Sequence, residues 1–279
     1  MSVWESPAKV NLSLEVGPPE ATGYHPLRSL AMCLDWCDLI RFEEADEDQL
    51  VIRGADLPDG GENLIWKAIS SKRKPEGRPQ LSIELEKSIA VAAGLGGGSS
   101  NAAAALMAWA DLNGTAVTTD DAAAIGADVP FFLAGGLRLL EGYGERLTKV
   151  KAQPELAMAI VVPPFELATA DVYRAWDRAG EPKGKSLDGR QLPPPLRGLG
   201  PFRNDLTPAA IELQPELGDF IDDLRERWGQ QVLMSGSGPA LFSWFADAGE
   251  AEGALAAAPK EARAVRAARF RPLGVDRVE

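Results

Sequence analysis

A run of small residues before position 102 limits the fold of this chain more than any other feature. The run is Gly94-Leu95-Gly96-Gly97-Gly98-Ser99-Ser100, and residues 101–109 that follow it are nearly all good helix formers. Four glycines within five positions leave backbone N–H groups unobstructed, and the start of a helix adds a partial positive charge. The pattern predicts a loop that leads into a helix and binds an anion, with a phosphate chain as the expected ligand.

Two well-known glycine motifs and a plain turn fit this run less well. A Walker P-loop requires a Gly-Lys-Ser/Thr tripeptide, which does not follow the run, and a dinucleotide-binding motif requires glycine at the position of Ser99. An ordinary turn from a strand into a helix would need only one or two glycines. We therefore favour a phosphate-binding loop over a purely structural turn.

The net charge of the chain argues against the binding of nucleic acid. With 29 basic and 41 acidic residues the formal net charge is −12, which argues against an extensive nucleic-acid groove. No apolar stretch reaches the ~18 residues of a membrane span, because residues 122–140 are interrupted by Asp128 and Pro130. Near the start, Glu5 stands where a signal peptide would carry basic residues. We expect a cytoplasmic protein that binds neither nucleic acid nor membrane. Its anion would be bound by a local site and not by the overall charge of the surface.

The scarcity of histidine and cysteine narrows the chemistry. His25 is the single histidine, so any His-based triad or His-rich metal site would have to use it, which excludes most of those chemistries. The two cysteines, Cys33 and Cys37, are too few for a disulfide scaffold and are expected to be structural. Carboxylates, lysines, hydroxyls and glycine backbone remain as the reactive groups.

Hydrophobic periodicity predicts an α+β organisation. Strands are expected over 10–16, 50–52 and 81–85 and helices over 62–69, 101–109 and 119–125; then follow a strand at 156–162, a helix at 211–228, strands at 232–234 and 240–245, a helix at 248–257 and a strand at 264–270. A change of composition near 151–154 predicts two domains, 1–152 and 153–279. Residues 180–201, rich in Gly, Pro and charge, are expected to form a surface loop or lid.

Three further features have both a structural and a functional interpretation. Lys9 shares strand parity with Asn11 and Ser13, so the pattern alone favours a solvated strand face. Apolar residues surround Asp128, and a buried carboxylate is rare unless it is paired or functional; a helix cap is the alternative. The turn Ser235-Gly236-Ser237-Gly238 either connects a hairpin or lets the backbone approach a ligand.

Five segments of the chain resemble, in order and spacing, the GHMP kinase superfamily, and the resemblance covers essentially the whole chain. They are Pro7-Ala8-Lys9-Val10-Asn11-Leu12, Gly23-Tyr24-His25, and residues 94–103, 126–132 and 234–240. The resemblance implies a two-domain α+β fold: an N-terminal ribosomal-protein-S5-like domain, a C-terminal ferredoxin-like domain, and an active site in the cleft between them. The first two segments together are narrower and point to one branch of the superfamily.

The resemblance to that branch implies an ATP- and Mg²⁺-dependent kinase. The implied acceptor is the 2-hydroxyl of a cytidine diphosphate-linked methylerythritol, in the non-mevalonate route to isoprenoid precursors. Two alternatives stay open: another GHMP kinase, acting on mevalonate, homoserine or a sugar, and a homologue that binds nucleotide without catalysis. The expected partners are these small molecules, and the chain is expected to be a monomer or a homodimer.

The resemblance also implies a role for particular residues. Asp128 would accept the proton from the acceptor hydroxyl, and Lys9 beside it would stabilise the negative charge of the reacting groups. The ATP site would consist of Asn63, Ala92, Ala93, Gly94, Leu95, Gly96, Gly97, Gly98, Ser99 and Ser100, with the hydroxyl of Ser99 or Ser100 near Mg²⁺. The acceptor would be bound by Asn11, Tyr24, His25, Tyr173, Ser235, Gly236 and Ser237, among which His25 reads the cytosine and Tyr173 stacks on it.

The chain departs from the family pattern in three places, one of which is the segment 180–201, which matches none of the family motifs. Ala90 replaces a proline that commonly precedes the glycine run, and the connection from Ser100 to Asp128 is about one helical turn shorter. The latter two departures bear on where Asp128 is seated. A basic stripe near the end of the chain matches no motif and is expected to be solvated surface: Arg263, Arg266 and Arg269.

Overall fold

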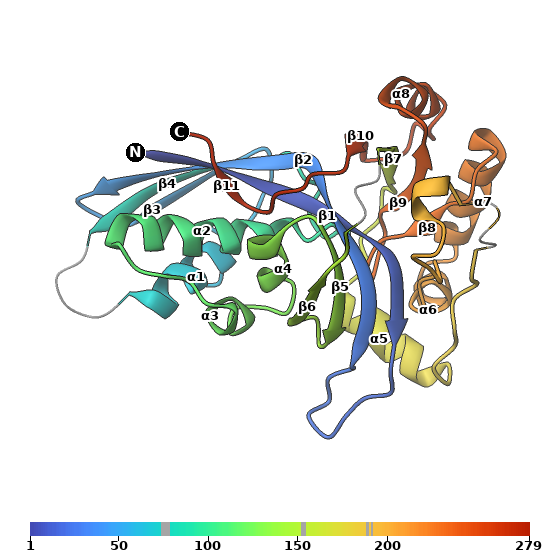
Figure 1. The fold of residues 1–279 in the computed structure, drawn as a ribbon, viewed down its shortest axis with the longest axis horizontal. Helices are drawn as coiled ribbons and strands as arrows, with labels where there is room; N and C mark the ends of the chain where they lie inside the picture. The colour runs from blue at the N-terminus through green and yellow to red at the C-terminus, as the bar shows by residue number, and fades with distance from the viewer. Residues whose placement is uncertain (74–78, 152–154, 188–189, 191) are drawn as a thin grey trace.

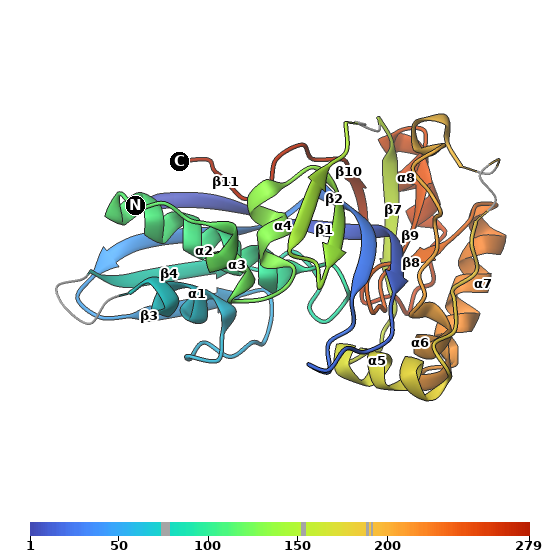
Figure 2. The same ribbon diagram turned by 60° about the horizontal axis from the view of Figure 1, so that its bottom comes forward.

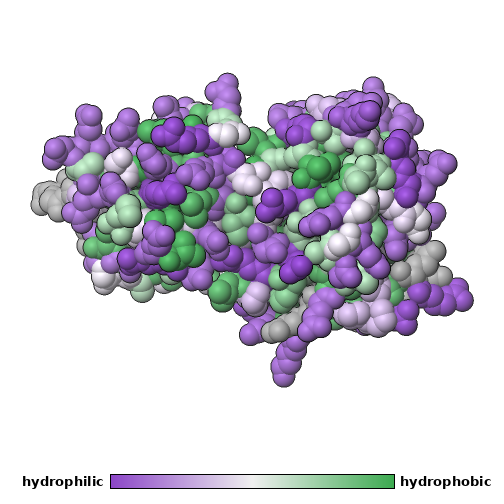
Figure 3. Space-filling view, turned by 90° about the horizontal axis from the view of Figure 1, so that it is seen from above, coloured by the Kyte–Doolittle hydropathy of each residue, from purple (hydrophilic) through white to green (hydrophobic). Residues whose placement is uncertain are grey.

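The computed structural model describes residues 1–73, 79–151, 155–187, 190 and 192–279, which form two lobes lying side by side (Figure 1). The expected domain boundary between residues 152 and 153 lies outside the described residues, so the division into 1–152 and 153–279 stays a prediction. Seen from above, hydrophilic side chains cover much of both lobes, and the hydrophobic ones lie in separate patches (Figure 3).

A large sheet organises the first lobe. Within the described residues it has seven strands, in the order β11-β1-β2-β4-β3, with β5 pairing β2 and β6. The strands are β1 (Ser2–Val16), β2 (Leu27–Ala45), β3 (Gln49–Arg53), β4 (Gln80–Glu86), β5 (Leu137–Gly142), β6 (Arg146–Lys149) and β11 (Asp276–Arg277). Because β11 pairs with β1, the chain ends beside its own start, as Figure 1 shows.

Four helices lie on one side of this sheet: α1 (Leu64–Lys72), α2 (Gly97–Asn113), α3 (Thr119–Ala123) and α4 (Val129–Ala134). The central one is α2, in which every residue from 100 to 106 is buried. Its alanines are small enough to let the sheet, α1 and α4 approach it from different sides. The alanine run therefore places the start of α2, with its glycines, deep between the packed elements.

The second lobe is a four-stranded antiparallel sheet in the order β10-β7-β9-β8, within the part of the chain that the structure describes. Its strands are β7 (Ala157–Val162), β8 (Leu233–Met234), β9 (Leu241–Phe245) and β10 (Ala264–Arg269), and its helices are α5 (Thr169–Arg178), α6 (Thr207–Leu213), α7 (Glu216–Trp228) and α8 (Ala248–Ala256). A β-α-β-β-α-β chain with this strand order is ferredoxin-like. The predicted α+β class and the ferredoxin-like second lobe are confirmed.

The two lobes share a core through β7. Met158, Ile160 and Val162 pack with residues of β1 and β2, whereas the alternate residues of β7 pack under the helices of the second lobe. Both faces of β7 are therefore buried, which explains its uninterrupted apolar sequence. Figure 2 shows α7 on the side of the second sheet away from the first lobe.

Several elements differ from the sequence predictions. The strands β2, β5 and β6 and the helix α5 were not predicted, since β2 carries charged and cysteine residues that interrupt its alternation. The single helix expected over 211–228 is wrong: α6 ends at Leu213 and α7 begins after Pro215, whose ring supplies no N–H to continue a helix. The structural role expected for the cysteines fits Cys33, where burial raises the thiol pKa to about 12.

The segment 180–201 is not a lid over a cavity in its described part. Residues 188, 189 and 191 lie outside the described residues. Leu192 and Leu196 are buried in the core between the lobes, and the amide of Leu187 bonds to the carbonyl of Phe202. The described residues of this segment therefore cover the core instead of closing a pocket.

Candidate active site

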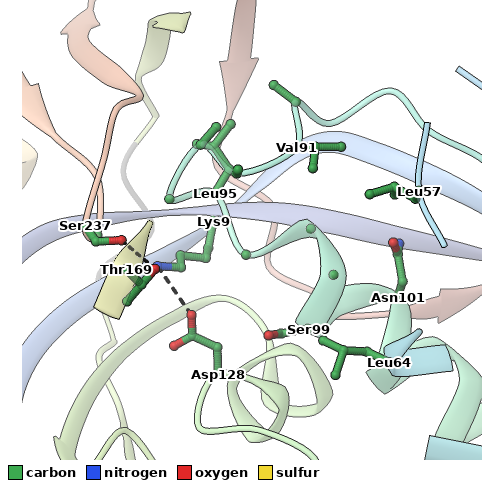
Figure 4. A pocket seen from close by; sticks show the side chains of 18 of the residues that line it. Lys9, Leu57, Leu64, Val91, Leu95, Ser99, Asn101, Asp128, Thr169 and Ser237 are labelled. Carbon is green, nitrogen blue, oxygen red and sulfur yellow. Dashed lines mark hydrogen bonds and ion pairs between the residues drawn. The ribbon is translucent and has the colours of Figure 1, made fainter. Parts of the chain in front are cut away.

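The glycine run opens into a cavity of about 470 Å³ between the two lobes (Figure 4). Its wall contains most of the residues predicted for the site: Lys9, Asn11, Asn63, Ala92, Ala93, Gly94, Leu95, Gly96, Gly97, Gly98, Ser99, Asp128, Tyr173, Gly236 and Ser237. Four predicted residues are not part of the wall: Tyr24, His25, Ser100 and Ser235. The tertiary fold thus brings together segments from both lobes around one space.

The start of α2 carries no side-chain cap. Gly96 occupies the N-cap position with φ of 72°, and no side chain bonds to the first amides of the helix. Among the described residues, none accepts a hydrogen bond from the amides of residues 97–99. These N–H groups, with the positive end of the helix dipole, can form an anion site at the cavity wall.

Two of the glycines are required by close packing. A Cβ on Gly94 would lie 2.2 Å from the carbonyl oxygen of Ser235, and one on Gly96 would lie 2.6 Å from the ring of Phe132. Both residues also have positive φ, which a side chain disfavours. The run is therefore shaped to lie flat between the second lobe and α4.

Lys9 lies at the bottom of the cavity. Its Nζ donates to Asn11 Oδ1 at 2.5 Å and stands 3.6 Å from Asp128 Oδ2. The solvated face expected for Lys9 is wrong: its side chain is 6% exposed, because the glycine run and the turn at 235–238 cover this side of β1. The polar residues of this strand face line a site instead of contacting bulk solvent.

Asp128 precedes α4 directly and is better exposed than its sequence neighbours suggest. Val129, Phe131 and Phe132 turn into the core, whereas the Asp128 side chain is 38% exposed and reaches into the cavity beside Lys9 and Ser99 (Figure 4). Asp128 stands at the N-cap position but makes no capping hydrogen bond. Neither the expected burial nor the alternative capping role describes it, and the short connection from Ser100 still seats it in the cavity.

A buried ion pair supports the glycine run from behind and was missed by sequence reasoning. Lys87 pairs with Asp38, whose carboxylate also accepts from the amides of Ser88 and Ile89 and from Asn101 Nδ2. Lys87 and Asn101 line the cavity. The available signal was the charge of Asp38 among the apolar residues of segment 36–40, since a buried carboxylate needs several donors.

The turn at 235–238 belongs to the second lobe and touches the glycine run. Ser235 Oγ donates to the carbonyl of Gly94 at 2.9 Å and accepts from the amide of Asn11, so Ser235 braces the wall from outside it. Asn204 holds the turn by donating to the carbonyls of Met234 and Gly236. Ser237 faces the cavity, where its hydroxyl lies 2.9 Å from that of Thr169, a second residue that sequence reasoning missed.

Only some of the residues predicted to bind a nucleotide base lie next to one another. Tyr173 lines the cavity, and its ring lies 4.9 Å from that of His25, which also contacts Trp176. His25 Nδ1 is 3.1 Å from the carbonyl of Gly17. Tyr24 is 70% exposed and packs against Tyr143 outside the cavity. His25 and Tyr173 are therefore neighbours at one end of the site, while Tyr24 stands apart from it.

The opposite end of the cavity is apolar. Its wall there contains Leu57, Pro58, Leu64, Leu85 and Val91. Asn63 lies next to this wall as the N-cap of α1: its Oδ1 accepts from the amide of Ile65 and its Nδ2 donates to the carbonyl of Pro58. This end can accommodate a flat aromatic group, with the glycine run between it and Asp128.

The residues at the anion site offer few protein ligands for a metal. Ser99 and Asp128 supply a hydroxyl and a carboxylate, whereas the buried Ser100 hydroxyl lies off the cavity wall. The described residues contain no group of three or more His, Cys, Asp or Glu side chains arranged to hold a metal. This donor set fits Mg²⁺ that is bound mainly by phosphate oxygens and water, as is usual for that ion.

None of the described helices has both the length and the apolar character that crossing a bilayer requires.

Two family models match this chain. Residues 63–136 match the GHMP kinases N terminal domain, and residues 189–264 match the GHMP kinases C terminal domain. The first match begins at Asn63, ends just after α4 and includes the glycine run and Asp128. The second covers the turn at 235–238.

Curated relatives of similar length share more than a third of the sequence. A 4-diphosphocytidyl-2-C-methyl-D-erythritol kinase of Pelotomaculum thermopropionicum is 36% identical over 253 residues, which cover 86% of this chain and 88% of the relative. The protein of the same name from Caulobacter vibrioides is 38% identical over 266 residues, covering 89% and 91%.

Solved structures agree with these sequence matches. A crystal structure of 4-(cytidine 5'-diphospho)-2C-methyl-D-erythritol kinase superposes with a TM-score of 0.80 at 35% identity and covers 96% of this chain and 98% of the other. A homoserine kinase from Cytophaga hutchinsonii superposes with a TM-score of 0.70 at 19% identity, covering 99% and 97%. The second similarity shows a shared fold alone.

Proposed function

The chain belongs to the GHMP kinase family, and from that premise we propose that it transfers the γ-phosphoryl group of ATP to the 2-hydroxyl of 4-diphosphocytidyl-2-C-methyl-D-erythritol. This reaction belongs to the non-mevalonate route to isoprenoid precursors. One observation carries the proposal: an uncapped helix start and the Lys9–Asp128 pair face the same cavity, in a chain more than a third identical to kinases of that name.

The start of α2 indicates where ATP, the phosphoryl donor, binds. The amides of residues 97–99 bind the phosphate chain of ATP, and its base lies at the apolar end beside Asn63 and Leu64. Mg²⁺ supplies charge neutralisation on the phosphate oxygens when it is bound, with Ser99 and Asp128 as the protein groups near it. This arrangement directs the terminal phosphate towards Asp128.

Asp128 and Lys9 perform the chemical step. The carboxylate of Asp128 accepts the proton of the acceptor hydroxyl as the hydroxyl oxygen bonds to the γ-phosphorus. The bond between the γ-phosphorus and the bridging oxygen breaks, and ADP leaves. Lys9 stabilises the charge on the carboxylate and on the transferring phosphoryl group. Phosphoryl transfer asks little covalent chemistry of a protein, so most of the acceleration comes from position and charge.

The acceptor substrate binds beside the turn at 235–238 of the second lobe. Asn11, Gly236 and Ser237 contact the methylerythritol and its phosphates, braced by Ser235. Tyr173 provides the flat surface for cytosine, and His25, whose ring packs on Tyr173, reads its edge. Tyr24 takes part only if it moves from its contact with Tyr143. The cytoplasm as compartment and the monomer or homodimer state stay predictions.

A coupled assay tests this function. Purified protein with Mg²⁺ and ATP is given the diphosphocytidyl substrate, mevalonate, homoserine or galactose, and ADP release is followed. We expect kcat/KM for the cytidine substrate to exceed the others by at least ~10³-fold. If mevalonate or homoserine is turned over equally well, the assignment of the cytidine substrate as the acceptor is wrong. If the protein binds ATP but turns over none of the acceptors, it is a non-catalytic homologue.

A further inference from the structure

The backbone just before the glycine run is held by its carbonyl oxygens. Arg263 Nη2 donates to the carbonyl of Val91 at 2.7 Å and to that of Ala92 at 3.2 Å. The amide of Ala240 donates to the carbonyl of Ala93 at 3.0 Å, and Ser235 Oγ donates to that of Gly94 at 2.9 Å. Four consecutive carbonyls are thus bound by donors that all come from the second lobe.

This arrangement decides where the amides of the loop point. In a planar trans peptide the C=O of one residue and the N–H of the next point in opposite directions. Carbonyls of residues 91–94 that face the second lobe therefore turn the amides of residues 92–95 away from it. Among the described residues, none accepts a hydrogen bond from these four amides, and all four residues line the cavity. The carbonyl contacts leave a row of free donors that continues the helix start.

Arg263 also has contacts outside the loop. Its own amide bonds to the carbonyl of Val162, and its Nη1 pairs with Glu166 Oε1 at 2.9 Å. The backbone of Arg263 is thereby fixed to β7, and its guanidinium lies between Glu166 and the loop. Ala92, whose carbonyl it holds, has a left-handed φ of 49°, which a residue with a Cβ disfavours. A donor on that carbonyl helps to keep the unfavourable conformation.

The arginines of the basic stripe that was expected to be solvated, Arg263, Arg266 and Arg269, therefore differ in their contacts. Arg263 makes three polar contacts through its guanidinium. Arg266 lies on β10, which begins directly after Arg263. It is exposed, and its side chain has no hydrogen bond or ion pair with the described residues. The two arginines have the same charge and lie close in sequence, so Arg266 provides a matched control.

We propose that Arg263 is a positioning residue for ATP, which presets the amides of residues 92–95 for the phosphate chain by binding the carbonyls of Val91 and Ala92. This inference rests on the proposed function insofar as the loop binds nucleotide. It does not depend on which alcohol accepts the phosphate. Arg263 touches neither reacting group, so its effect falls on nucleotide affinity before it falls on the chemical step.

The test measures binding of a non-hydrolysable ATP analogue with Mg²⁺ by calorimetry. The proteins are wild type, Arg263→Gln, Arg263→Lys and Arg266→Gln, with melting temperatures recorded for all. We expect Arg263→Gln to raise Kd about tenfold, because a lost charged hydrogen bond has a cost of that order. Arg263→Lys keeps the charge without the planar fork and is expected to raise Kd about threefold. Arg266→Gln is expected to stay within twofold of wild type.

Steady-state kinetics separates positioning from general destabilisation. For Arg263→Gln we expect KM for ATP to rise by a similar factor, while KM for the cytidine substrate and the melting temperature stay near those of Arg266→Gln. If Arg263→Gln does not fold, Arg263→Lys carries the same comparison. Arg263 variants that bind the analogue as tightly as Arg266→Gln overturn the inference and leave the kinase function standing. A wild-type protein that binds no analogue overturns both.

Discussion

The ammonium of Lys9 and the carboxylate of Asp128 approach to 3.6 Å at the junction of β1 and α4. Lys9 is almost fully buried, whereas Asp128 keeps about a third of its side chain open to the cavity. The carboxylate therefore has a cation on one side and room for a ligand hydroxyl on the other. This asymmetry suits a group that must receive a proton from a bound alcohol.

Replacing the carboxylate by an amide tests that role. Asp128→Asn keeps the size of the side chain but cannot accept the proton, so we expect kcat to fall at least ~10²-fold while ATP affinity changes less than about threefold. Single-turnover kinetics and analogue binding measure the two quantities. Asp120→Asn, an exposed position in α3, is the matched control and should behave as wild type. An unchanged kcat in Asp128→Asn would remove this residue from the mechanism.

Close packing around the glycine run predicts an intolerant position. Gly96→Ala places a Cβ 2.6 Å from Phe132 Cζ and 3.1 Å from Lys9 Cγ, at a residue with φ of 72°. We expect the free energy of unfolding to fall by roughly 2–4 kcal/mol and nucleotide binding to weaken. Urea unfolding measures the first effect. In the control Gly253→Ala no atom lies within 4 Å of the new Cβ and the site is helical, so its stability should hold or rise by up to ~1 kcal/mol.

The cap of α3 predicts a pH-dependent contribution to stability. An ion pair with Lys72 and hydrogen bonds from Thr118 lower the pKa of Asp121 from 3.8 to about 2. A lowered pKa in the folded state means that the stabilisation is complete above the unfolded value and is lost as pH falls from about 4 through about 2. Asp121→Asn should therefore be less stable than wild type at pH 7, and the difference should shrink towards pH 2.5. A difference that stays constant over this range contradicts the assignment.

The aromatic cluster at the acceptor end predicts a selective loss of affinity. His25→Ala removes the ring that packs 4.9 Å from Tyr173, so we expect KM for the cytidine substrate to rise about tenfold while KM for ATP is unchanged. Initial-rate kinetics with each substrate varied in turn measures both values. The reverse pattern, in which only KM for ATP rises, would refute a role for His25 in binding cytosine.

Much of the fold could be predicted because its signals are local. The glycine run before an alanine-rich helix and the apolar strand β7 each depend on residues adjacent in the chain. The break between α6 and α7 is also local, and Pro215 is the residue that signals it. By contrast, β2 could not be identified from alternation, because Asp38 interrupts its apolar pattern and is bonded by residues far along the chain, Ile89 and Asn101.

The amino-acid sequence was enough to locate a loop that could bind an anion, since backbone freedom and helix propensity are properties of neighbouring residues. It also determined which side chains were available to react, because the chain has one histidine and few cysteines. The folded structure was needed to show that Lys9 is buried, that Asp128 is open, and that Arg263 bonds to the loop while Arg266 does not. Burial and pairing depend on which distant segments meet, and that is settled by packing the two lobes together.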